Sequence, residues 1–87
     1  MFFYVYILES RITGEWYFGF TKDLRRRLKE HNDGASFSTK SACPWRIIYY
    51  EASLDKRDAE RREKYLKTTQ GRRMIRRRLW YYIRTAP

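Results

Sequence analysis

Cysteine is nearly absent from this sequence of 87 residues, and Cys43 is the only one. A chain with one thiol cannot close an internal disulfide. With a single histidine as well, it cannot supply the cysteine and histidine ligands of a zinc site. We therefore expect no zinc, and we expect Cys43 to be a small packing residue rather than a nucleophile. The lack of disulfides favours a cytoplasmic protein.

Long hydrophobic runs are also missing. The most apolar segment, residues 2–8, is too short to cross a bilayer and ends at Glu9. It has neither a basic leader nor a small-residue cleavage site, which argues against a signal peptide. Neither a membrane span nor a membrane partner is expected.

Acidic residues are scarce, with 10 of them against 20 lysines and arginines, so the formal net charge is +10. After Glu63 there is no acid at all. A small, strongly basic protein typically binds a polyanion. Nucleic acid is the first candidate and an anionic membrane the second, and we favour nucleic acid as the partner. Arginines interleaved with aromatic rings near the C-terminus favour phosphate binding over a merely solvated face. The expected nucleic-acid-binding residues are Arg26, Lys64, Lys67, Arg72, Arg73, Arg76, Arg77 and Arg78.

Hydrophobic residues, in contrast, make up 43% of the chain and aromatic residues 18%, which is typical of a folded protein. The length predicts one domain over residues 1–87. Alternating apolar patterns predict strands over residues 2–8, 16–20 and 45–52. Capping residues and helical spacing predict helices over about residues 21–32, 56–67 and 72–83, with a loop over residues 33–43. The order β-β-α-β-α-α indicates an α+β fold, a small sheet with helices packed on it.

Three polar side chains fall on faces that helical spacing predicts to be apolar. Glu63 lies between Ala59 and Leu66 on such a face, where a carboxylate needs a cation, either an arginine or a metal. Arg27 and His31 follow Leu24 at helical spacing, so both are predicted to point toward the sheet. For His31, a hydrogen-bonded core histidine and a functional group are equally compatible with this position.

Four short motifs in register resemble the GIY-YIG nuclease domain, in particular its small bacterial stand-alone members. A more distant resemblance is to the N-terminal nuclease domain of the excision-repair incision subunit. The motifs are Tyr4-Val5-Tyr6, Tyr17-Phe18-Gly19, the helix segment Leu24 to Asn32, and the segment Arg62 to Lys67. The match covers most of the chain, from about residue 3 to residue 67. Tyr4 stands where the first motif has glycine and Phe18 where the second has Ile or Val. Phe20 stands where some relatives carry a polar residue near the substrate.

This resemblance implies a three-stranded antiparallel sheet flanked by helices, and hydrolysis of phosphodiester bonds with one metal ion. It assigns the catalytic positions to Tyr6, Tyr17, Arg27, His31 and Glu63, with Glu63 as the metal ligand. One carboxylate can hold Mg²⁺, which keeps most of its waters; Mn²⁺ is the alternative ion. Arg27 would hold the phosphate. We favour Tyr6 as the general base and Tyr17 as the residue that orients the water, with His31 assisting either.

The leading hypothesis is a metal-dependent endonuclease acting on DNA rather than RNA, with a branched or damaged structure as a candidate substrate and DNA repair as the context. One alternative is a nucleic-acid-binding module that keeps the fold with little or no catalysis. Another is a structural RNA-binding protein, which accounts for the charge but not for a carboxylate at Glu63.

Overall fold

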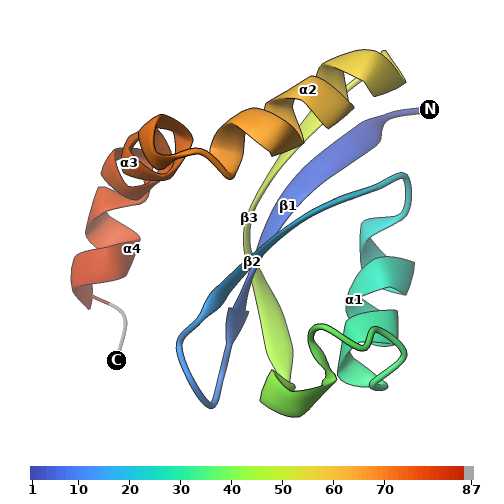
Figure 1. The fold of residues 1–87 in the computed structure, drawn as a ribbon, viewed down its shortest axis with the longest axis vertical. Helices are drawn as coiled ribbons and strands as arrows, with labels where there is room; N and C mark the ends of the chain where they lie inside the picture. The colour runs from blue at the N-terminus through green and yellow to red at the C-terminus, as the bar shows by residue number, and fades with distance from the viewer. Residues whose placement is uncertain (86–87) are drawn as a thin grey trace.

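Three antiparallel strands form the centre of the fold, in the order β2-β1-β3. The computed structural model describes residues 1–85, and Figure 1 shows their arrangement. Along the chain the elements are β1 (Phe3–Ser10), β2 (Trp16–Thr21), α1 (Leu24–Asn32), a 3₁₀ turn (Lys40–Ala42), β3 (Trp45–Ser53), α2 (Lys56–Leu66), α3 (Thr69–Arg78) and α4 (Trp80–Thr85). The expected α+β fold with a three-stranded antiparallel sheet is confirmed.

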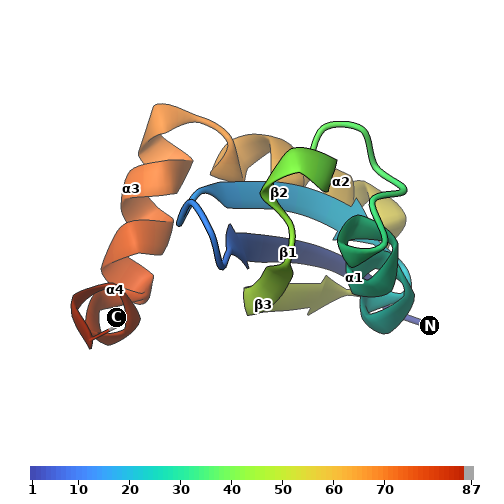
Figure 2. The ribbon, with the colours of Figure 1, turned by 90° about the horizontal axis from the view of Figure 1, so that it is seen from below.

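Helices cover both faces of this sheet, because side chains alternate between the two faces along β1. Val5 and Ile7 point to one side and pack, with Phe18, against α2 and α3. Tyr6 and Leu8 point to the other side, where they pack against α1 and the segment that follows it. Figure 2 shows α1 in front of the sheet and α2 behind it.

The helix starts follow the capping residues in the sequence. Asp23, rather than Thr21, caps α1 by accepting a hydrogen bond from the backbone N–H of Arg26. Asp55 caps α2 as expected, through the N–H of Arg57. Each cap pairs a backbone donor that the helix itself leaves free.

The C-terminal helical segment differs from the prediction of one helix over residues 72–83. It forms two helices, α3 and α4, and Leu79 between them has φ −96° and ψ 32°. The turn lets Tyr82 donate a hydrogen bond to the Glu9 carboxylate, which also accepts hydrogen bonds from Trp16 and Arg46. This contact joins the C-terminal helix to the first strand, at the other end of the sequence. A second difference concerns residues 33–43, which were predicted to be a loop: they contain the short 3₁₀ turn over residues 40–42.

No helix within residues 1–85 combines the length and the apolar character needed to cross a membrane.

Candidate active site

The side chain of Tyr6 lies across the edge strand β2 at Gly19. Tyr6 and Gly19 are direct partners in the β1–β2 ladder, and Tyr6 is only 2% exposed. A Cβ added at Gly19 would lie 2.2 Å from Cζ of Tyr6, far inside van der Waals contact. Glycine is therefore needed here so that the tyrosine ring can lie flat over the strand and carry its hydroxyl toward α1.

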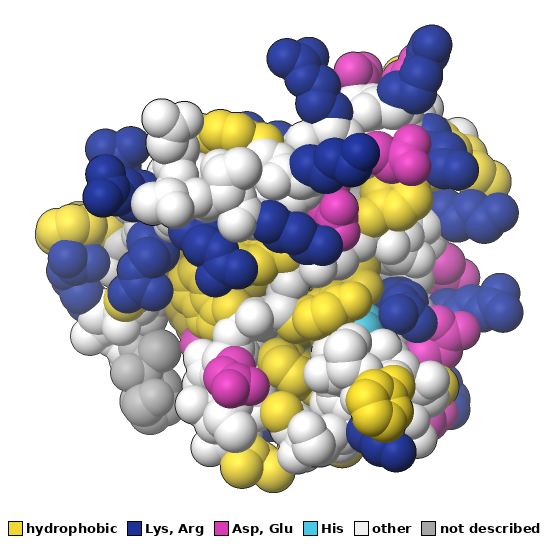
Figure 3. All heavy atoms as spheres, viewed as in Figure 1, with side chains coloured by type: hydrophobic (Ala, Val, Ile, Leu, Met, Phe, Trp, Pro, Cys, Tyr) yellow, Lys and Arg dark blue, Asp and Glu magenta, His cyan; other side chains and the backbone are white. Residues whose placement is uncertain are grey.

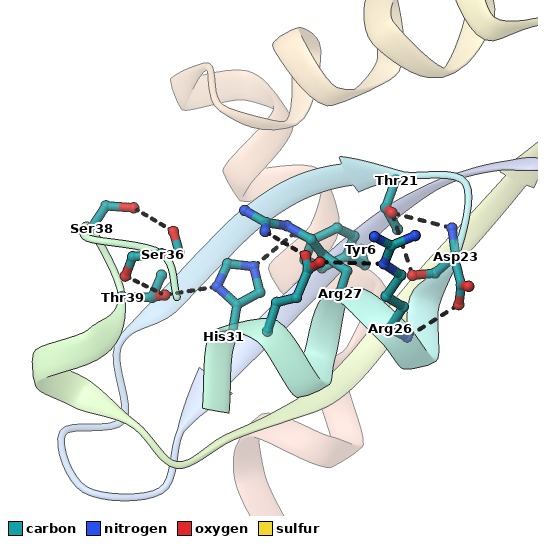
Figure 4. Close-up of polar contacts among 10 residues, drawn as sticks. Tyr6, Thr21, Asp23, Arg26, Arg27, His31, Ser36, Ser38 and Thr39 are labelled. Atoms are coloured by element: carbon teal, nitrogen blue, oxygen red, sulfur yellow. Dashed lines mark hydrogen bonds and ion pairs between the residues drawn. The ribbon is translucent and has the colours of Figure 1, made fainter. Parts of the chain in front are cut away.

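A chain of hydrogen bonds continues from the Tyr6 hydroxyl to a fully buried histidine on α1. The hydroxyl lies 3.0 Å from Nε2 of His31, and Nδ1 of His31 lies 2.7 Å from Oγ1 of Thr39. Thr39 in turn donates to the carbonyl of Ser36 at 3.5 Å. Because the Thr39 hydroxyl donates its proton to that carbonyl, it accepts a hydrogen bond from Nδ1–H of His31. Nε2 of His31 then carries no proton and accepts the hydrogen bond from the Tyr6 hydroxyl. Figure 4 shows Tyr6 and His31 pointing toward one another and Thr39 closing the other end.

Tyr17 and Arg27 complete this group on the α1 side of the sheet. The rings of Tyr17 and His31 are edge to face, with centroids 4.9 Å apart, and the rings of Tyr6 and Tyr17 are 6.4 Å apart. The Arg27 side chain is 31% exposed and donates to Glu30 at 2.9 Å. Arg27 thus sits at the boundary between the buried tyrosine and solvent, where a guanidinium can meet an incoming anion.

Glu63 approaches from α2, which packs on the opposite face of the sheet and also contacts the edge strand β2. Its neighbours Ala59 and Leu66 are fully buried, while the Glu63 side chain is 20% exposed. The side chain paired with this carboxylate is Lys67, at 3.0 Å and one helical turn away, and not the arginine considered from the sequence. The negative charge of Glu63 makes a small contribution to raising the pKa of the Tyr6 hydroxyl.

Burial shifts the proton affinities of both buried members of the group. It raises the pKa of the Tyr6 hydroxyl to about 12; Arg27 opposes the rise, and the charge of Glu63 adds to it. Burial, together with the nearby charge of Arg27, lowers the pKa of His31 to about 4. At neutral pH the pair is therefore an uncharged phenol beside an uncharged imidazole.

The donor set around Glu63 suits one type of metal ion. Within residues 1–85 no three histidine, cysteine or acidic side chains gather to form a protein cage. A single half-buried carboxylate open to solvent matches Mg²⁺, which is commonly bound by one or two carboxylates and keeps several waters.

The sequence-predicted site residues therefore fall into two groups. Tyr6, Tyr17, Arg27 and His31 lie together on the α1 side, whereas Glu63 lies on α2, which packs on the other face of the sheet. The predicted nucleic-acid-binding residues are more dispersed. Arg26 is on α1, exposed and paired with Glu30, whereas the others lie on α2, at its end, or on α3. Figure 3 shows basic side chains gathered over α2 and α3, beside an apolar area.

Two residues next to the site escaped the sequence reasoning. Thr39 lies in a segment without periodicity, so nothing in the sequence indicated that it would be buried against His31. Glu30, which holds Arg27, carried a weak signal, because an acid three residues after an arginine on a helix is a common pair.

Comparisons with known proteins agree with this architecture. A family model described as the GIY-YIG catalytic domain matches residues 2–77. A UPF0213 protein of Clostridium perfringens is 38% identical over 65 residues, which cover 74% of this chain and 69% of that protein. The UPF0213 protein YazA of Bacillus subtilis is 40% identical over 67 residues, covering 76% of this chain and 65% of YazA. The match to a Streptococcus pneumoniae UPF0213 protein likewise spans 65% of that relative.

Among solved structures, the solution NMR structure of a UPF0213 protein from Bacillus halodurans is similar to this one. The TM-score is 0.53 with 35% sequence identity, over 86% of this chain and 82% of that chain.

Proposed function

Because this chain belongs to the GIY-YIG family, which is a family of nucleases, we propose that it is a metal-dependent endonuclease that hydrolyses phosphodiester bonds in DNA. The observation that carries the proposal is the group of Tyr6, Arg27 and His31. In it the Tyr6 hydroxyl lies 3.0 Å from Nε2 of His31, Arg27 lowers the pKa of Tyr6, and the charge of Glu63 on α2 has a small opposite effect. These side chains come from three different elements, β1, α1 and α2.

In this proposal each side chain has one task. Arg27, with part of its guanidinium in solvent, holds the non-bridging oxygens of the phosphate and the charge that develops on them. Tyr17, half-buried on the edge strand, orients the attacking water. His31 is positioned to hold the Tyr6 hydroxyl proton at Nε2 and so fixes where the hydroxyl oxygen points.

Glu63 is the proposed ligand of a divalent cation, with Mg²⁺ favoured and Mn²⁺ as the alternative. The ion would supply charge neutralisation at the phosphate and at the leaving oxygen. Lys67, whose amine lies 3.0 Å from Glu63, must release the carboxylate or share it. Since this pair is half-exposed and spans one helical turn, separating it costs little.

Tyr6 is the proposed acceptor of the proton from the attacking water. A phenol with a pKa of about 12 keeps its proton at neutral pH, so catalysis requires that its pKa fall in the substrate complex. Arg27 already lowers it, and neutralising the charge of Glu63 would remove one cause of the rise. Cleavage is therefore expected to increase with pH above neutrality.

The alternative is a nucleic-acid-binding module of the same fold with little or no catalysis. Two observations favour this alternative: the pKa of Tyr6 is raised, so its hydroxyl keeps its proton, and Glu63 is already paired with Lys67. In both cases we propose that residues 1–87 act as one domain, and that the protein works in the cytoplasm, which the single cysteine favours. A role in DNA repair on branched or damaged DNA belongs to the nuclease reading.

The deciding experiment is nicking of supercoiled plasmid with Mg²⁺, with Mn²⁺ and with EDTA. Wild-type protein should nick with a metal and not with EDTA, and Glu63→Gln should be inactive. Glu60→Gln is the matched control, because Glu60 is exposed on the same helix and loses the same charge. A wild-type protein that binds the plasmid but never nicks it identifies the binding module.

A further inference from the structure

Two arginines of α3 stand over aromatic rings of the edge strand β2. Cζ of Arg72 lies 5.1 Å from the ring centre of Phe18, and Cζ of Arg76 lies 5.7 Å from that of Trp16. Trp16 and Phe18 also contact each other edge to face. The rings thus restrict where each guanidinium can lie, which lowers the entropy lost when the guanidinium binds a ligand.

These two arginines line a groove of about 250 Å³, together with Gly14, Trp16 and Phe18. Arg76 also borders a second groove of about 390 Å³, lined further by Arg77, Trp80, Ile83 and Arg84. The two grooves therefore meet at Arg76 and run from the β1–β2 turn toward α4. We call the pair Arg72 and Arg76, with the rings beneath them, the arginine tract.

The tract has no carboxylate to neutralise it. Within residues 1–85, the ion pairs involve basic residues of α1, β3 and α2, together with Lys67 at the end of α2, and none from α3 or α4. Arg72 donates to the backbone carbonyl of Lys67, and the side chain of Arg76 makes no hydrogen bond to any residue among 1–85. A group of like charges that the fold leaves unpaired repels itself, so an anionic ligand would stabilise it.

We propose that the arginine tract binds the phosphate backbone of nucleic acid without reading its bases, and this inference rests on the proposed function. Phe18 is buried, and Trp16 is half-buried with a guanidinium over its ring, so neither offers a free face on which a base could stack. The guanidinium edges remain open, and their paired N–H groups match two oxygens of one phosphate. The tract therefore recognises phosphate geometry rather than sequence.

The position of the tract gives it a role in placing the substrate. Side chains alternate along β2, so Trp16 and Phe18 point to the α2 and α3 side, whereas Tyr17 and Gly19 point to the candidate site. The tract thus lies on the face of β2 that is packed against α2, the helix that carries Glu63, whereas Tyr6, Tyr17 and His31 lie on the other face. The outer edge of β2 is unpaired within the sheet. A backbone held by the tract would reach the site around this edge.

The test is the salt dependence of binding to a fluorescein-labelled DNA duplex, measured by anisotropy in EDTA so that cleavage plays no part. Arg72→Gln with Arg76→Gln should make the slope of log affinity against log salt shallower by up to about 2, at roughly 0.9 per phosphate contact. Lys56→Gln with Arg61→Gln is the control. Both residues are exposed on α2 without an ion pair, and the change in charge is the same.

A second variant, Arg72→Lys with Arg76→Lys, keeps the charge and removes the planar fork. We expect it to keep the steep slope while the affinity falls, and two duplexes of different sequence should bind wild-type protein equally. A slope unchanged from wild type in the glutamine variant would overturn the proposal, as would a sequence-dependent affinity.

Vesicles of phosphatidylserine and phosphatidylcholine test the competing polyanion. Binding to them as tight as to DNA, with the same loss in the glutamine variant, would also overturn the proposal. Plasmid nicking is scored separately. If wild-type protein nicks plasmid but the glutamine variant keeps the wild-type salt slope, only the arginine tract is refuted. If the glutamine variant has the shallower slope but wild-type protein never nicks, only the nuclease function is refuted.

Discussion

Glu63→Gln separates a catalytic carboxylate from a structural one. The substitution keeps the shape of the side chain and removes its charge. If Glu63 holds the metal, plasmid nicking should fall on the order of a hundredfold or more, which corresponds to about 2.7 kcal/mol of lost transition-state stabilisation. Binding to DNA should persist, because one negative charge near the phosphates has gone.

The expected effect on stability is small, and it follows from the partner that the structure gives Glu63. Lys67 is one turn away from Glu63; the Lys67 side chain is 50% exposed and the Glu63 side chain 20% exposed. Pairs of this kind stabilise a protein by about 0.3–0.5 kcal/mol. For a domain of this size that corresponds to a drop in melting temperature of about 2–3 °C. An arginine partner deep in the core would have implied a loss several times larger.

Lys67→Gln provides the matched control, since it removes the same ion pair and leaves the carboxylate in place. Both variants should melt at nearly the same temperature, but only Glu63→Gln should lose the dependence of nicking on Mg²⁺ concentration. The Lys67 variant should bind Mg²⁺ as well as wild type or better, because a competing cation has gone. Because Lys67 is also an expected DNA contact, the two variants are compared at saturating DNA. Equal loss of activity per folded molecule there would refute the assignment of Glu63 as metal ligand.

Three further predictions concern the groups that position this site. Gly19→Ala places a Cβ 2.2 Å from Cζ of Tyr6, so the ring must move; we expect about 1–3 kcal/mol of lost stability by urea unfolding, and wild-type stability would contradict the close approach. His31 has its pKa lowered to about 4 by burial, so between pH 6.5 and 4 the unfolded chain takes up the proton first and stability falls with pH. The loss should be about 2 kcal/mol from pH 7 to about pH 5, and a His31→Asn variant with an equally steep fall would refute it. Tyr82→Phe removes a hydrogen bond to the Glu9 carboxylate and should cost about 1.5–3 kcal/mol and speed amide exchange in α4; unchanged exchange would show that this contact does not hold the helix.

The fold could be predicted from the sequence because its signals are local. Alternation of apolar residues placed the three strands, and the aspartates at positions 23 and 55 placed two helix starts. The inward positions of His31 and Glu63 followed from helical spacing alone, since each lies one or two turns from an apolar residue on the same face. The buried histidine is confirmed, whereas its chemical role stays a prediction.

The features that sequence reasoning missed depend on contacts between distant residues. The helical pattern continues through Leu79, but the chain turns there, and Tyr82 beyond the turn meets a carboxylate on β1, at the other end of the sequence. Thr39 is buried because a loop without periodicity folds over α1, and no local pattern marks such a residue. The two alternatives weighed for Glu63, an arginine and a metal, did not include the lysine one turn further along its own helix.

The unpaired edge of β2 is the feature that connects these observations. An exposed edge strand rich in aromatic residues is a template for pairing with a second copy of the chain, and proteins commonly oppose this with charge. Here Arg72 and Arg76 stand over rings of that strand without acidic partners, so two copies approaching edge to edge would meet cation against cation. A polyanion, in contrast, is attracted by these two arginines. The same positive charge that opposes self-association thus favours the binding of nucleic acid at this edge. Tyr6 lies over Gly19 of the same strand and carries its hydroxyl to the candidate site.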